Sequence, residues 1–174
     1  MTTIANPPKP RWSRAKAINL TCLVAIAWIA LIESVGAFVH LGYDPQVTRC
    51  LPWRVYAINQ QRPDVVEAGR IYVYRARHIP LMRDGASVIK YAAAVAGDRI
   101  HVDSKGISIN GRYWGPLNPS VMEKGNVGVS DVTKDYTVPV GHVLMLGTEP
   151  RSWDGRYWGL LKTSQIFAKA RPLW

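Results

Sequence analysis

Two patterns of apolar and polar residues divide the chain. Residues 17–39 form a run of 23 residues of which only four are polar. As a helix this run would be about 35 Å long, enough to cross a hydrocarbon core of about 30 Å. Beyond residue 40 the apolar residues come in short groups, and no long stretch repeats at the helical period. The pattern therefore predicts an N-terminal transmembrane helix over 17–39, followed by a domain of another kind.

The short groups after residue 40 are rich in β-branched and aromatic residues, and Gly- or Pro-bearing breaks separate most of them. This arrangement is typical of strands joined by turns. Asn110-Gly111 predicts a type I′ hairpin turn, because these residues tolerate the positive φ that the turn needs. Residues 115–137 are polar and predict a long surface excursion. The fold class is therefore mainly β, with strands expected at 55–58, 70–74, 87–91, 99–102, 106–109 and 143–146.

The N-terminal flank of the apolar run is basic: residues 1–16 carry four basic residues and no acidic one. The positive-inside rule places such a flank in the cytoplasm. The sequence thus predicts a cytoplasmic tail (1–16), a single membrane span (17–39) and a domain on the far side of the membrane (40–174). A cleaved signal peptide is the alternative, but its apolar region is about 7–15 residues long. The longer run favours an uncleaved anchor in contact with membrane lipids.

The net charge of +10 suits a protein that works beside anionic lipid headgroups or beside nucleic acid. The basic residues are scattered, and no Lys/Arg-rich run or nucleic-acid motif is present, so no nucleic-acid partner is expected. The four histidines lack the spacing of metal ligands. We therefore expect neither a metal nor another cofactor.

Three groups carry candidate chemistry. Cys50 is the only cysteine outside the apolar run, and a lone cysteine is either an inert small hydrophobe or a nucleophile. Without a second cysteine in its domain, a thiol redox role is disfavoured. Lys90 follows Val88 and Ile89 and precedes an alanine-rich stretch. It either reaches solvent, the more common outcome, or is desolvated and supplies a neutral amine as general base. Asp154 and Arg156 most simply form an ion pair at a turn.

Together these stretches resemble the signal peptidase I clan, membrane-bound peptidases whose nucleophile is activated by a lysine. The likeness is greatest to the conjugal-transfer peptidases of the TraF type, which process pilin precursors. It covers essentially the whole chain after the apolar run. The opening motif of the family is a small hydroxyl residue, any residue, the nucleophilic serine, an apolar residue and proline. The matching stretches here are 48–52, Val88-Ile89-Lys90 leading to Gly97-Asp98, and 152–159.

The resemblance implies a signal-peptidase-like β domain and a role for each matching residue. Cys50, in place of serine, would attack the scissile carbonyl, and Lys90 would take its proton. The Cys50 backbone N–H and the Thr48 hydroxyl would form the oxyanion hole. Ser152 would orient Lys90. Asp154 and Arg156 would hold the third matching stretch, residues 152–159, in its conformation.

The chain also departs from the family pattern. Cysteine replaces the nucleophilic serine, Gly155 stands where serine is common, and Leu160 stands where proline often follows. Gly147-Thr148-Glu149 replaces the usual Gly-Asn before the third matching stretch. The change from serine to cysteine puts the mechanism in question more than the fold.

The resemblance implies an endopeptidase that removes the leader of a conjugative pilin precursor. An acyl-enzyme on Cys50 would be a thioester, which favours attack by amines, so cyclisation of the pilin is a further hypothesis. The alternative is a non-catalytic scaffold of the conjugation (type IV secretion) machinery that kept the fold and lost the serine. Retention of Lys90 and Ser152 favours the enzyme. The expected partners are the pilin precursor, membrane lipids and the conjugation machinery. In a conjugation system the membrane would be the cytoplasmic (inner) membrane, and the domain over 40–174 would lie in the periplasm.

Overall fold

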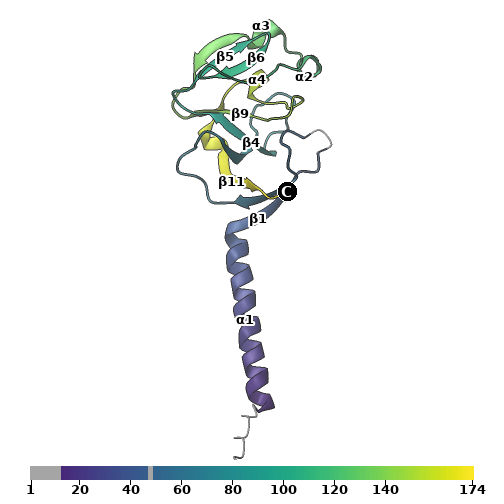
Figure 1. The fold of residues 1–174 in the computed structure, drawn as a ribbon, viewed down its shortest axis with the longest axis vertical. Helices are drawn as coiled ribbons and strands as arrows, with labels where there is room; N and C mark the ends of the chain where they lie inside the picture. The colour runs from purple at the N-terminus through teal and green to yellow at the C-terminus, as the bar shows by residue number, and fades with distance from the viewer. Residues whose placement is uncertain (1–12, 47–48) are drawn as a thin grey trace, which may run out of the picture. The chain divides into compact units, whose positions relative to one another are not determined.

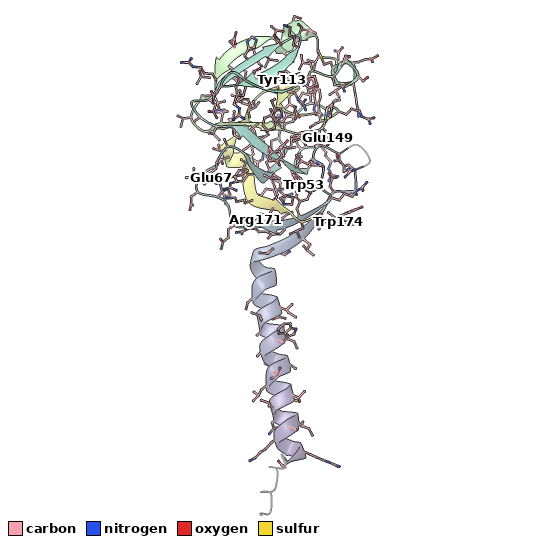
Figure 2. All side chains as sticks on the ribbon, viewed as in Figure 1. Trp53, Glu67, Tyr113, Glu149, Arg171 and Trp174 are labelled. Atoms are coloured by element: carbon pink, nitrogen blue, oxygen red, sulfur yellow. The ribbon has the colours of Figure 1, made fainter. Side chains whose placement is uncertain are left out.

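The structure, a computed structural model, describes residues 13–46 and 49–174. It divides the chain into two compact units, with the boundary between Ala37 and Phe38. The first unit holds all of helix α1 (Arg14–Phe38) except its last residue (Figure 1). Its side chains project on all sides (Figure 2), and Arg14–Ser34 is long and apolar enough to cross a membrane. The prediction of one N-terminal apolar helix is confirmed, and its passage through a membrane remains a prediction.

The second unit is mainly β, as the sequence predicts. Its helices are short: α2 (Pro119–Gly125), α3 (Val129–Val132), α4 (Gly155–Trp158) and the 3₁₀ turn η1 (Thr163–Gln165). Its strands are β1 (Val39–Tyr43), β2 (Val55–Asn59), β3 (Arg70–Arg75), β4 (Ser87–Ala94), β5 (Arg99–Asp103), β6 (Gly106–Ile109), β7 (Arg112–Gly115), β8 (Lys134–Thr137), β9 (His142–Leu146), β10 (Leu161–Lys162) and β11 (Ile166–Pro172).

The strands form two antiparallel sheets. The larger has the order β1-β2-β11-β3-β4-β9-β10, and the smaller has the order β7-β6-β5-β8. In the domain, the small sheet lies with α3 at one end, and β1 and β11 lie at the other (Figure 1). Strand β4 is central to the large sheet, because β3 and β9 pair with its two edges. A residue in the middle of β4 is therefore screened from solvent along both edges of its strand.

All six strands expected from the sequence are present, and the hairpin turn has the expected geometry. Asn110 and Gly111 have φ angles of 50° and 77°, and Ile109 pairs with Arg112 across the turn. Two positive φ angles in a two-residue loop define the type I′ turn. The turn thus fixes the register of β6 against β7.

Most of residues 115–137 lie at the surface, as predicted, but the helices and strand within this stretch were not predicted. This stretch contains α2, α3 and the edge strand β8. Asn118 caps α2 by accepting hydrogen bonds from the backbone N–H groups of Ser120 and Val121, a strong helix-start signal followed by Pro119. Val121 and Met122 on α2 are buried in the core. The polar composition hid a short helix because only these two residues face inward.

Three apolar clusters fill the domain. One joins the small sheet to β9 and to α2 through residues such as Ile100, Ile107 and Leu144. The other two cover opposite faces of the large sheet, one that includes Tyr72 and Met145 and one that includes Leu51. The chemistry-bearing residues lie beside the clusters of the large sheet.

Candidate active site

Cys50 lies on a short segment that is fixed from both sides. Its carbonyl oxygen accepts hydrogen bonds from the backbone N–H groups of Thr148 and Glu149, at 3.0 and 3.3 Å. The next residue, Leu51, is only 1% exposed and packs in the third cluster. Burial of a leucine side chain contributes about 1.5–3 kcal/mol, so it anchors the chain beside the thiol. Cys50 itself is half-buried.

Lys90 is fully buried, with 0% of its surface exposed. It lies in β4 directly opposite Tyr72 of β3, on the face where Val88 and Ala92 pack into the second cluster. The reading of the sequence in which this lysine reaches bulk solvent is therefore wrong. A polar group buried in this way requires a hydrogen-bond partner.

The Lys90 amine has a specific partner in Ser152. Its Nζ donates to the Ser152 Oγ at 2.9 Å, and Ser152 is also 0% exposed. The Ser152 backbone N–H in turn bonds to the carbonyl of Glu149, at 3.0 Å. The serine is therefore held by main-chain geometry, and it fixes the direction of a side chain that has four rotatable bonds.

Asp154 and Arg156 form a buried ion pair. The Arg156 Nε and Nη2 donate to the two Asp154 carboxylate oxygens, at 2.9 and 2.7 Å, and the two side chains are 2% and 0% exposed. Burial disfavours the charged guanidinium, but the hydrogen bonds and charge of Asp154 outweigh it and raise the pKa of Arg156. The sequence expectation of a simple turn ion pair therefore understates this interaction.

The pair ties separate segments together through the backbone. Asp154 caps α4 by accepting from the Arg156 N–H, and it also accepts from the Gly147 N–H, at 2.9 Å. Arg156 donates to the carbonyls of Pro116 and Glu149, at 3.0 and 3.3 Å. These bonds hold the end of β9, the Ser152 turn and the start of α4 in one arrangement. The supporting role expected of the pair fits this network.

Cys50 and Lys90 line the same cleft, which has a volume of about 550 Å³. In the described part of the chain no hydrogen bond joins the Cys50 thiol to Lys90, and the amine bonds to Ser152 instead. Catalytic hydrogen bonds are often long before substrate binds. Thr48, the other residue assigned to the oxyanion hole, lies outside the described residues. Within the described ranges, no group of three or more His, Cys, Asp or Glu residues could hold a metal ion.

The site combines a cysteine, a buried lysine bonded to a serine, and a buried ion pair between Asp154 and Arg156. This combination is consistent with a peptidase that depends on a lysine. A family model described as signal peptidase, peptidase S26, matches residues 12–174. The chain belongs to the signal peptidase family. Members of this family are hydrolases that act on precursor polypeptides, which sets the reaction class and the substrate class.

Among solved structures, the chain is similar to a signal peptidase I from Enterococcus faecalis. The two are 26% identical over 57% of this chain and 92% of that chain, with a TM-score of 0.34. No curated protein matches the chain. For the present chain, the prediction of a mainly β domain after one apolar helix is confirmed. The roles of the individual site residues remain predictions.

Sequence reasoning missed two features of the site. Tyr74 lies on the same face of β3 as Tyr72, the partner of Lys90, and its buried hydroxyl has no hydrogen-bond partner among the described residues. Burial is the main cause that raises the pKa of Tyr74 well above its ordinary value, and the nearby Cys50 and Asp154 add smaller contributions. The second feature is the close packing around Gly147, a residue that the sequence marks only as a departure from the family pattern. Its packing shows why a glycine stands there.

We expect Gly147→Ala to damage the site. A Cβ at this position would overlap the Ser152 side chain and the Cys50 carbonyl oxygen, so the added methyl group pushes on both halves of the site. Overpacking of this kind costs about 1–3 kcal/mol, and a misplaced catalytic group costs about 10²-fold in rate. The check is the cleavage rate together with thermal unfolding. Gly36→Ala, where a Cβ meets no atom within 4 Å and φ is not positive, is the control, and equal rates for the two variants would refute this account.

Proposed function

We propose that this signal peptidase is a membrane-anchored endopeptidase of the conjugal-transfer, TraF-like type, which removes the leader of a pilin precursor. In this proposal residues 1–16 lie in the cytoplasm, 17–39 span the inner membrane and 40–174 work in the periplasm. The apolar helix and its basic flank support the topology. The three motifs around Cys50, Lys90 and Ser152 support the subfamily.

The observation that carries the proposal is the buried Lys90–Ser152 hydrogen bond at the wall of the cleft that Cys50 also lines. In the proposed reaction the Cys50 sulfur attacks the scissile carbonyl carbon, and the Lys90 amine accepts the thiol proton. The oxyanion is held by the Cys50 N–H and the Thr48 hydroxyl. Lys90 then gives its proton to the departing amine, which leaves a thioester on Cys50. A thiol is more acidic than an alcohol, so it demands less of its base than serine does.

The thioester is resolved by a second nucleophile. Water, deprotonated by Lys90, would release a linear product with a new carboxylate and regenerate the thiol. An amine would instead form a new peptide bond and release the same thiol. A cyclic pilin requires a cut at the C-terminal side of the pilin, so that the thioester on Cys50 carries the pilin itself and the residues beyond the cut depart as the amine. Because thioesters favour amines over water more than oxygen esters do, the N-terminus of the pilin is then a competent acceptor, and a cyclic product is the second outcome to look for.

A non-catalytic scaffold of the conjugation machinery is the second candidate, and the observation that favours it is cysteine at the position of the family's serine. The burial of Lys90 weighs against it. A scaffold gains nothing from a fully buried amine, which costs free energy to desolvate, or from the serine that holds it. The enzyme proposal accounts for both residues.

The test is to co-express the full chain with the pilin precursor of the same conjugation system and to weigh the product by mass spectrometry. We expect the precursor to disappear and a shorter product to form only when the peptidase is present. A linear product carries the mass of one added water relative to the cyclic form, so the two resolutions of the thioester differ by about 18 Da. An intact precursor, under conditions in which the host matures the same pilin, would favour the scaffold.

A further inference from the structure

In the part of the chain that the structure describes, the cleft that holds Cys50 and Lys90 is also lined by three cationic side chains and by no acidic residue. Arg83, Lys124 and Arg151 contribute to its walls, and each is exposed. Among the described residues, none of the three takes part in an ion pair. A cleft lined by one sign of charge focuses its field and attracts ligands of the opposite sign.

The three cations come from three separate segments. Arg83 lies in the connection between β3 and β4, Lys124 in the last turn of α2, and Arg151 directly before Ser152. A basic side chain at a helix C-terminus is favourable by itself, which explains Lys124 in part. It does not explain the arrival of Arg83 and Arg151 at the same cleft. Convergence from three segments points to a shared ligand.

The connection that carries Arg83 is held in place over the cleft. The Trp153 Nε1, from the Ser152 box, donates to the Pro80 carbonyl at 2.8 Å. Asp84, the acidic residue next to Arg83 in the sequence, accepts a hydrogen bond from the His78 N–H at 2.7 Å. Leu81 keeps a φ of 63°, a backbone state that non-glycine residues adopt only when their surroundings impose it. The position of Arg83 at the cleft is therefore built into the fold.

We propose that the polypeptide bound in this cleft carries acidic side chains close to the scissile bond, and that Arg83, Lys124 and Arg151 select for them. This rests on the proposed function, since it names a property of the segment that Cys50 would cut. The cleft also contains apolar groups such as Leu81, Val88 and Trp153. An acidic segment with apolar residues between its carboxylates matches both features. Anionic lipid headgroups share the charge, but they do not need the cations to lie beside the cysteine.

The experiment measures binding apart from cleavage. Full-length Cys50→Ala protein in a nonionic detergent is titrated into two fluorescent 12-residue peptides that differ only in carrying four Glu or four Gln at the same positions. We expect the Glu peptide to bind about tenfold tighter at about 50 mM salt. The advantage should largely vanish near 1 M salt, where the Debye length is about 3 Å. Equal affinity for the two peptides at low salt would overturn the proposal.

Charge reversals then locate the effect. Arg83→Glu, Lys124→Glu and Arg151→Glu are each expected to weaken binding of the Glu peptide about three- to tenfold and to leave the Gln peptide unchanged. Lys105→Glu makes the same change in net charge at an exposed position between β5 and β6 and should change neither. If Lys105→Glu has an equal effect, only net charge matters and the proposal fails.

Two further outcomes separate this inference from its rivals. If the three reversals reduce binding to vesicles containing phosphatidylglycerol but do not alter peptide discrimination, the cations serve lipid headgroups and the proposal is wrong. If the Glu preference holds while the pilin precursor stays intact, the selectivity stands and the pilin assignment fails. If the precursor is cleaved but the Glu peptide binds no tighter than the Gln peptide, the pilin assignment stands and the proposed selectivity fails.

Discussion

Cys50→Ala and Lys90→Ala should each abolish processing of the pilin precursor, while Cys50→Ser should keep a measurable fraction. The alanine at position 50 leaves no nucleophile. The alanine at position 90 removes the proton acceptor, and general acid–base catalysis is worth about 10²–10⁴-fold in rate. Serine fills the same space and is the residue that the family uses, but its less acidic hydroxyl demands more of Lys90. Initial rates of precursor loss, measured by mass spectrometry, give the comparison.

Loss of activity counts only if the fold survives, so the lysine needs a matched variant. Lys90→Met keeps an unbranched side chain in the buried site and removes the amine. The change removes the cost of burying the amine, but it also leaves the buried Ser152 hydroxyl without its partner, so we expect the unfolding temperature to stay close to that of the wild type. Lys105→Met, at an exposed position, should retain full activity. A fully active Lys90→Met would exclude the lysine as the base, whatever its burial.

The fold follows from local signals where those signals are strong. β-branched runs and turn residues predicted six strands, and Asn110-Gly111 predicted its turn. Strands β1, β7, β8, β10 and β11 were not predicted from the sequence. Strand β1 continues an apolar run at Val39, and β11 joins the sheet between β2 and β3, far away in the sequence. Such long-range pairing is decided by tertiary packing, which a local pattern does not contain.

Some features of the candidate site could be predicted from the sequence, and others could not. The resemblance to signal peptidases implied roles for Cys50, Lys90 and Ser152, and the structure brings Lys90 to Ser152 and both Cys50 and Lys90 to one cleft. The burial of Lys90 could not be decided from the sequence, because an apolar neighbourhood in a strand suits a snorkelling lysine equally well. The bonds from Thr148 and Glu149 to the Cys50 carbonyl involve backbone groups, which every residue possesses. The cationic lining also went unseen, because its members are far apart in the chain.

Asp154→Asn should cost far more stability than its size suggests. The change keeps the side-chain volume and one acceptor oxygen for the α4 cap, but it removes the charge that compensates Arg156. Arg156 is only 3% exposed, and an uncompensated buried charge costs about 3–5 kcal/mol. The measurement is the free energy of unfolding from urea titrations of the full chain in detergent. Glu67→Gln, which breaks exposed ion pairs with Arg70 and Lys169, is the control and should change stability by no more than about 1 kcal/mol.

A second substitution shows whether the penalty comes from the unpaired charge. In Asp154→Asn/Arg156→Met the buried cation is gone, so part of the lost stability should return, although Arg156 also loses its bonds to the Pro116 and Glu149 carbonyls. Processing should remain impaired in both variants, because the Ser152 turn that holds Lys90 depends on the same network. If Asp154→Asn destabilises no more than Glu67→Gln, the ion pair contributes little to stability. If Asp154→Asn lowers the free energy of unfolding by less than about 3 kcal/mol but still stops cleavage, the ion pair acts mainly by positioning Ser152. In that case its main contribution is to the geometry of the Lys90–Ser152 hydrogen bond.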